Sequence, residues 1–286
     1  MERRLGAVVS LAFDDCSTVY GRFKLLDSFD GLLDRPIIQD ELEKKYVGLV
    51  QAYGQDLKSV QELFLQYRDN NCPISWNMPP ITGALTWCRG LVERITHPML
   101  KLNQLDKTII EREEAKEVAK VFTTIVSLLT EFEIQKIDEW ARDVEQTSQA
   151  KLKLPLIVRN SDTRQISVNF DPALVKLLRE VKYFLLLNLR DNVPESALDI
   201  YQHVETFRAW TGNLDLIVNM NNDVLAILLP VEKPLVAPYL TKFDNAVEKG
   251  ISSMNWKSNG ITEFISDAME QVKGIQFVNQ LLNFYK

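Results

Sequence analysis

Apolar residues recur at helical spacing over most of the chain. From Pro36 to about Asn71 they return every three or four residues, with Gly54 inside the run. This pattern predicts one helix of about 35 residues, roughly 50 Å long at a rise of about 1.5 Å per residue. The apolar positions in residues 2–29 predict two shorter helical pieces that are interrupted near Gly21. Helices this long are typical of elongated bundles.

Two regular apolar stripes predict helices that pack on other helices. A helix is expected from Pro80 to a break at His97-Pro98, and its apolar positions repeat at spacings of 4, 3, 4 and 3 residues: Ile81, Leu85, Cys88, Val92 and Ile95. A further helix, expected from Leu100 to about Ala150, carries the same spacing and resumes it after one slip: Val118, Phe122, Ile125, Leu129, Phe132, then Ile137, Trp140 and Val144. Such a repeat resembles a coiled-coil seam, so each stripe should face a partner helix.

Residues 154–170 differ because their apolar positions alternate with polar ones. Period two on both sides of the turn-forming run 160–163 predicts an antiparallel β-hairpin. Beyond the hairpin, Ser196 and Asp199 have the spacing of a capping box. Helical spacing returns there and predicts helices over 172–190, 196–229, 233–250 and 260–284.

These patterns predict an all-α protein, an elongated, stalk-like multi-helix bundle with one short β-hairpin around residues 154–170. The chain of 286 residues exceeds the usual size of a single core, so we expect two domains. Residues 1–150 would form an N-terminal long-helix bundle. Residues 151–286 would begin with the hairpin and continue as a second helical bundle. The low counts of 11 Gly and 11 Pro favour long regular elements.

Charge and composition narrow the choice of partner. The net charge of −6 is spread along the chain without a basic block, which argues against nucleic acid. The longest apolar run, Val224–Val231, is eight residues and too short to cross a membrane. No signal-peptide core follows the first four residues, so we expect a soluble, cytoplasmic chain. Three widely spaced cysteines fit neither a disulfide framework nor a zinc cluster, and we interpret them as reduced thiols.

The sequence contains no recognisable catalytic motif. Neither a phosphate-binding Gly-x4-Gly-Lys-Ser/Thr loop nor Gly-x-Gly-x-x-Gly occurs, so we expect no nucleotide turnover and no cofactor. His97 and His203, the two histidines, lack nearby Cys or His, as a metal site would require. Asp14-Asp15 resembles a Mg²⁺-binding acid pair but lacks a third acid one turn later, so a solvated helix face is the preferred interpretation.

One stretch combines a well-specified helix start with a recognisable string. Asp171 is a good N-cap, and Pro172 at N1 loses nothing by lacking an N–H donor. Phe170 at N′ is expected to pack on Val175 at N4. The string over 168–183 reads V-N-F-D-P-A-L-V-K-L-L-R-E-V-K-Y, and its characteristic residues are Asn169, Phe170, Asp171, Pro172, Leu178, Arg179 and Glu180.

This string resembles part of the N-terminal tail of dynein heavy chains. An upstream run resembles the N-P-P-x-x-G-x-L-x-W motif of the same region through Asn77, Pro79, Pro80, Gly83, Leu85 and Trp87. Three later blocks match in order: 194–197, 230–235 and 250–258, the last of which contains Trp256. Five ordered blocks over about residues 3–268 make the resemblance specific, and the subtype resembled is axonemal and of the outer-arm type.

The resemblance implies a non-catalytic stalk of helical bundles near the base of a motor. In that family the region joins heavy chains to one another and to intermediate chains with β-propeller domains, and thus indirectly to microtubules of the cytoskeleton in a cilium or flagellum axoneme. The matching residues carry over as fold-defining positions, with Trp87, Phe170 and Trp256 as expected core anchors. Residues 274–286 do not match the family's continuation, and the ATPase ring is missing, so no motor activity is expected of this chain.

Two alternatives remain open at this point. An unrelated spectrin-like scaffold or tether would also be helical, although an internal repeat would be expected and the ordered dynein-type blocks argue against it. An all-α metal-dependent enzyme would need a third clustered carboxylate beside Asp14-Asp15, which is missing.

Overall fold

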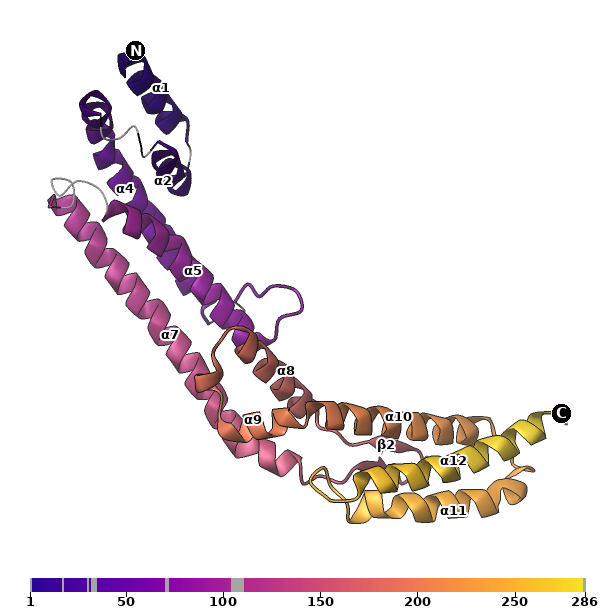
Figure 1. Cartoon of the computed structure of the whole chain (residues 1–286). Helices are drawn as coiled ribbons and strands as arrows, with labels where there is room; N and C mark the ends of the chain where they lie inside the picture. The colour runs from indigo at the N-terminus through magenta and orange to yellow at the C-terminus, as the bar shows by residue number, and fades with distance from the viewer. Residues whose placement is uncertain are drawn as a thin grey trace. The chain divides into compact units, whose positions relative to one another are not determined.

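The computed structural model describes residues 2–16, 18–29, 31, 35–69, 72–103 and 111–284 (Figure 1). Within these residues the chain forms ten α-helices, one short 3-10 helix and one two-stranded sheet. The predicted all-α class with a single hairpin is therefore confirmed for this part of the chain. The internal packing defines two units, unit 1 over Met1–Asp138 and unit 2 over Glu139–Lys286. The division into domains at residue 150 stays a prediction.

Unit 1 is helical throughout its described residues. Its central helix, α4, packs against α1, α2 and α5. The apolar stripe of α4 is buried from Tyr46 to Phe64, and its part from Tyr53 onward shares one core with α5 and α7. The residues of those helices in this core include Cys88, Ile95, Ile125 and Leu129. The predicted stripes therefore do face partner helices. The helices of this unit are α1 (Glu2–Asp15), α2 (Val19–Ser28), α4 (Pro36–Tyr67), α5 (Pro80–Leu102) and the first part of α7 (Glu113–Lys151).

The break between the first two helices lies earlier than predicted. Gly21, where the interruption was expected, is inside α2. Its N–H donates to the hydroxyl of Thr18 at 3.0 Å. A hydroxyl just before a helix that accepts from the third helical N–H is a capping contact. Thr18 therefore starts the second helix, and Gly21 does not end the first.

The predicted break at His97-Pro98 is wrong, because α5 continues through Pro98 to Leu102. A proline inside a helix removes one N–H donor, here the one that the carbonyl of Arg94 would accept. Tyr53 of α4 donates its hydroxyl to the carbonyl of Ile95 at 2.7 Å. Within α5, the hydroxyl of Thr96 donates to the carbonyl of Val92 at 2.7 Å. The Tyr53 hydroxyl thus ties the turn before Pro98 to α4.

The long helix predicted from Leu100 to Ala150 is α7, which begins at Glu113. Leu100 itself belongs to α5, and residues 104–110 of the prediction lie outside the described residues. The predicted stripe of α7 points inward as expected. Its buried members are Ile125, Leu129, Phe132, Ile137, Trp140 and Val144, and its half-buried members are Val118 and Phe122.

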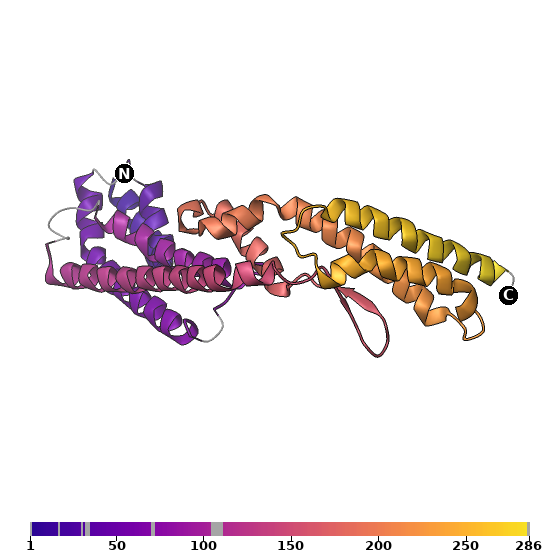
Figure 2. The same ribbon diagram turned by 90° about the horizontal axis from the view of Figure 1, so that it is seen from below.

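Unit 2 combines the hairpin with a group of helices. Strands β1 (Ile157–Arg159) and β2 (Ile166–Val168) pair antiparallel, with Val158 opposite Ser167, and the hairpin projects from the helices (Figure 2). Helix α12 packs against α10 and α11, and β2 packs against α10. The helices that follow the hairpin are α8 (Pro172–Leu186), the 3-10 helix η1 (Arg190–Asn192), α9 (Glu195–Gln202), α10 (Val204–Ile227), α11 (Lys233–Ser252) and α12 (Ile261–Phe284).

Side chains from two helices hold the hairpin in place. The Asn222 side chain of α10 accepts from the N–H of Ile166 at 3.1 Å and donates to its carbonyl at 2.8 Å, as a neighbouring strand would. On the other strand, Arg159 forms an ion pair with Asp244 of α11 at 2.7 Å. A two-stranded hairpin is only marginally stable alone, so these contacts supply the support it needs.

Two predictions for unit 2 need correction. The helix expected over 196–229 is two helices, α9 and α10, because His203 leaves the helical conformation with ψ of 13°. No proline or glycine marks this break. The expected capping box at Ser196 is also wrong, since Pro194 is the N-cap, Ser196 lies inside the helix, and its buried hydroxyl has no hydrogen-bond partner.

Candidate functional site

The N-P-P run builds the start of α5. Asn77 has a φ of 71°, in the left-handed region that asparagine tolerates. It lies in a turn that is closed by the N–H of Met78 donating to the carbonyl of Ser75 at 3.1 Å. Pro79 is the extended N-cap residue, and Pro80 occupies the first helical position, where a missing N–H costs nothing. These residues fix the direction in which the chain enters α5.

Gly83 is required by a close approach from the preceding loop. A Cβ atom at this position would lie 2.4 Å from Cγ2 of Ile74, which is closer than real Cβ contacts allow. The neighbour is the side chain of Ile74. Gly83 thus anchors the loop before α5 onto the first turn of that helix.

The remaining motif residues of α5 line the core of unit 1. Leu85 is fully buried, whereas Trp87 is half-buried and packs on the core from its edge. The Trp87 ring stacks on Phe64 at 5.9 Å between ring centroids and meets Phe132 edge-on at 6.5 Å. The expected anchor is therefore an aromatic contact between α4, α5 and α7, although it is not a fully enclosed one.

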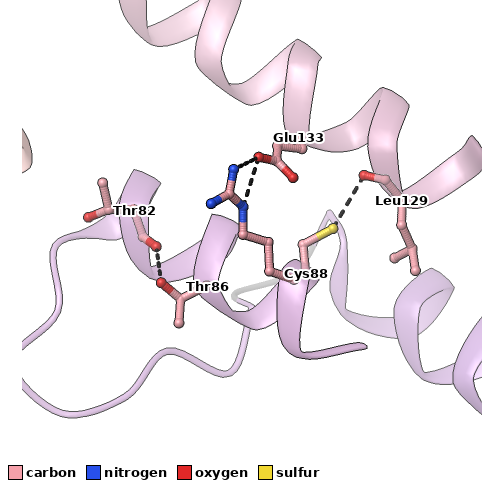
Figure 3. Close-up of polar contacts among 6 residues, drawn as sticks. Thr82, Thr86, Cys88, Leu129 and Glu133 are labelled. Carbon is pink, nitrogen blue, oxygen red and sulfur yellow. Dashed lines mark hydrogen bonds and ion pairs between the residues drawn. The ribbon is translucent and has the colours of Figure 1, made fainter. Parts of the chain in front are cut away.

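Next to this aromatic group, α5 and α7 are joined by polar contacts (Figure 3). The thiol of Cys88 donates to the carbonyl of Leu129 at 3.3 Å, and Arg89 Nε donates to Glu133 at 2.9 Å. Burial, with a smaller contribution from the Glu133 charge, raises the pKa of the Cys88 thiol to about 12. Cys88 is therefore a structural thiol and a poor nucleophile.

The second motif begins α8 as the sequence predicts. Asp171 accepts from the N–H of Ala173 at 2.7 Å, and Pro172 occupies the first turn. The expected staple partner, Val175, is exposed over 54% of its surface. The ring of Phe170 lies against two distant aromatic residues, Trp256 at 4.8 Å and Phe207 at 5.7 Å, and its contact with Val175 stays a prediction.

Trp256 connects three parts of unit 2. Its side chain is 2% exposed, and its indole N–H donates to the carbonyl of Asn169 at 2.9 Å. Its backbone N–H donates to the carbonyl of Leu152 at the end of α7 at 3.1 Å. Asn169 also donates its side-chain amide to the carbonyl of Pro155 at 3.0 Å. We call this group, Pro155, Asn169, Phe170 and Trp256, the hairpin-base node.

The last three motif residues lie on different faces of α8. Leu178 is half-buried, Arg179 is exposed, and Glu180 is 3% exposed. The structure therefore places the two motif groups in separate units, one around α5 and one around the hairpin-base node. Neither group brings together an acid, a base and a nucleophile, so both serve to start helices and to join elements.

Two other places where chemistry was considered lie in unit 1. Asp14 forms an ion pair with Lys45 of α4, which ties α1 to that helix. A groove of about 900 Å³ between α2, α4 and α5 contains His97 and the Asp56–Arg94 ion pair. Among the residues that the structure describes, no three His, Cys, Asp or Glu side chains gather as a metal site would require. In the same residues, no helix is both long and apolar enough to span a bilayer.

Sequence reasoning missed the exposed apolar residues, which are the usual candidates for protein contacts. Trp76 is 96% exposed at the turn before α5. On α12, Phe277, Leu281 and Phe284 are also exposed. Their spacing of four and three residues was visible in the sequence. The same helix carries a second apolar stripe with helical spacing, which is buried, and the pattern alone does not show which of the two faces the core.

Comparison with known proteins gives a consistent result over nearly the whole chain. The family model described as "Dynein heavy chain, N-terminal region 1" matches residues 1–264. The dynein beta chain of the flagellar outer arm of Chlamydomonas reinhardtii is 40% identical over 97% of this chain. A ciliary dynein beta chain of Tripneustes gratilla is 35% identical and human dynein axonemal heavy chain 9 is 30% identical, each over 96% of this chain. The chain spans only 6 to 7% of the length of these relatives.

Proposed function

The chain belongs to the dynein heavy chain family, as part of its N-terminal region, and we propose that it is a non-catalytic tail segment of an axonemal heavy chain. Its role is assembly. It contacts dynein intermediate chains and other heavy chains, and through them serves microtubule-based motility in the cytoskeleton of a cilium or flagellum axoneme. The flagellar and ciliary names of the relatives support this location.

The observation that carries the proposal is the use made of the motif residues. Asp171 caps a helix, Gly83 admits a neighbouring side chain, and Trp256 joins the hairpin to two helices. These are structural tasks. Together with the similarity over 97% of the chain to an outer-arm protein, they favour a packing and assembly module over a site of chemistry.

The proposal is tested by recovery of partners from axonemal extract. The tagged 286-residue chain is incubated with the extract at about 0.15 M salt, where screening leaves only close contacts. An unrelated helical bundle of similar net charge serves as the control bait. We expect the tagged chain to recover dynein intermediate or heavy chains and the control bait to recover none. If a cooperatively melting chain recovers no dynein subunit, the assembly role is wrong.

A further inference from the structure

A pocket of about 420 Å³ opens in unit 2 beside the hairpin-base node. Its lining comes from the end of α7, from α9 and α10, and from the loop that joins α11 to α12. His203, at which the chain leaves the helical conformation between α9 and α10, is part of the lining. This volume lies within the range of pockets that hold small molecules or inserted side chains. We call it the α9–α10 pocket.

The inner part of the α9–α10 pocket is apolar. Four of its lining residues are buried: Leu152, Ile200, Phe207 and Trp256. A fifth, Trp210, is half-buried and meets the ring of Phe207 edge-on at 5.9 Å between centroids. Both indole N–H groups already have acceptors, the carbonyl of Asn169 for Trp256 and the hydroxyl of Thr262 for Trp210. The aromatic lining therefore offers carbon surface, which suits an aromatic side chain.

The wall that the α11–α12 loop contributes is held by hydrogen bonds of its own. The N–H of Asn255 donates to the hydroxyl of Ser258 at 2.9 Å, and the N–H of Lys257 donates to the side-chain oxygen of Asn255 at 3.0 Å. Between them, the backbone N–H of Trp256 donates to the carbonyl of Leu152 at 3.1 Å. Because this wall is formed in advance, little order has to be gained on binding, and one inserted side chain can provide measurable affinity.

The rim of the α9–α10 pocket carries one charge of each sign, next to His203. Asp199 belongs to α9 and Lys257 to the α11–α12 loop, and both side chains are exposed. Within the described residues of unit 2 neither forms an ion pair, and the Lys257 ammonium donates to the side-chain oxygen of Gln149. A ligand that complements this rim therefore carries a cation for Asp199 and an anion for Lys257.

We infer that the α9–α10 pocket binds a segment of a partner protein in which one aromatic side chain stands between a basic and an acidic residue. The aromatic side chain enters the apolar part of the pocket and provides most of the contact energy. The basic residue pairs with Asp199 and the acidic residue with Lys257, and these pairs decide which segment is accepted. This inference rests on the proposed assembly role in taking the partner to be a subunit of the same complex.

The test uses short fluorescein-labelled peptides of Gly and Ser with a central Phe as probes. The mixed peptide has Lys on one side of the Phe and Glu on the other, two further peptides have Lys or Glu on both sides, and a fourth is the mixed peptide with Ala in place of Phe. Binding to the 286-residue chain is followed by fluorescence anisotropy at about 0.05 M salt, where screening is weak. The rim variants are Asp199→Lys and Lys257→Glu. The matched controls, Asp223→Lys and Lys242→Glu, change exposed charges of α10 and α11 outside the pocket.

We expect the mixed peptide to bind in the micromolar range, the two like-charged peptides about threefold more weakly, and the Ala peptide at least about tenfold more weakly. Asp199→Lys should come to prefer the peptide with two Glu, and Lys257→Glu the peptide with two Lys, while the control variants keep the order of the parent chain. Circular dichroism melts verify that all variants stay folded. Absence of saturable binding, equal binding of the Phe and Ala peptides, or an unchanged order in the rim variants would overturn the inference. So would a dimer in light scattering that Asp199→Lys abolishes, because the occupant would then be a second copy.

The same variants separate this inference from the proposed function. If the chain and its Asp199→Lys variant recover the same dynein subunits in equal amounts from axonemal extract, the pocket is not the contact site and the inference fails, while the assembly role stands. If the chain recovers no subunit but distinguishes the peptides as expected, the assembly role fails and the chemistry of the pocket holds.

Discussion

Single buried groups in the core of unit 1 resist ionisation, and Tyr53 is one of them. Its side chain is fully buried, and its hydroxyl donates to the carbonyl of Ile95 at 2.7 Å. Burial, and then the nearby Asp56 charge, raise the pKa of Tyr53 well above its ordinary value of 10.0. The folded state therefore holds the proton at a pH at which the unfolded chain releases it. Stability from this group is complete below pH 10.0 and is lost as the pH rises above that value.

We predict that Tyr53→Phe lowers the free energy of unfolding by about 1 kcal/mol at pH 7, because the Ile95 carbonyl loses its side-chain donor. The difference between variant and parent should shrink above pH 10, since only the parent has a tyrosine to ionise at this position. Urea unfolding at several pH values between 7 and 11 measures this difference. A constant difference over that range would mean that Tyr53 ionises as freely in the folded chain as in the unfolded one.

Burial also opposes ionisation of the Cys88 thiol. With the pKa raised from 9.0 to about 12, its reactive thiolate at pH 8 is about 1,000-fold rarer than that of an ordinary cysteine. We predict that Cys88 is the last of the three cysteines to react with a disulfide reagent and that it reacts promptly only after unfolding. Mass spectrometry of labelled peptides measures the order in which the three cysteines react. The Cys88→Ser substitution should remove the slowest phase of this labelling reaction. Rapid labelling of native Cys88 would contradict its burial.

At the scale of elements, the sequence predicted two helix starts that depend on neighbours along the chain, although the capping box expected at Ser196 was wrong. Asp171 and Pro172 start α8, and Pro80 starts α5, because capping needs only the first turn. Pro98 was misjudged, since α5 continues through it to Leu102, and a proline rule read along the chain takes no account of packing on other helices. The break at His203 was missed because no local residue signals it.

At the candidate sites, too, the sequence identified the residues but not their distant contacts. The sequence identified Trp87 and Trp256 as anchors of their motifs but gave no measure of how deeply each is buried. A local rule paired Phe170 with Val175, and the fold adds the rings of Phe207 and Trp256 as its neighbours. Those contacts join residues far apart in sequence, so periodicity and capping rules could not have found them.

The two tryptophans give a prediction for the elements they join. Trp256→Ala should cost about 3 to 5 kcal/mol, because the ring is enclosed, and Trp87→Ala about 2 kcal/mol, because that ring is half-buried. Trp256→Phe keeps an aromatic ring but leaves the Asn169 carbonyl without its donor, for a loss of about 1 to 2 kcal/mol. Urea unfolding of the three variants measures the loss in the free energy of unfolding for each and so gives their order. Equal losses for the two alanine variants would show that burial does not govern these positions.

At the scale of the whole molecule, similarity and packing together define what kind of segment this is. The chain matches dynein heavy chains over 96 to 97% of its own length while spanning 6 to 7% of theirs. Its motif residues start helices and join elements in two separately packed units. What this segment presents within its described residues is therefore helical surface together with one hairpin.

The last prediction concerns nucleotide. The sequence has no phosphate-binding loop, so we expect ATP to leave the melting temperature of the chain unchanged, with or without Mg²⁺. A ligand at about 100 times its dissociation constant would stabilise the folded chain by about 2.7 kcal/mol, so 1 mM ATP would reveal any site with a dissociation constant near 10 μM. Tripolyphosphate at equal ionic strength controls for salt. A shift of several degrees with ATP and none with tripolyphosphate would establish a nucleotide site and would require a role beyond assembly.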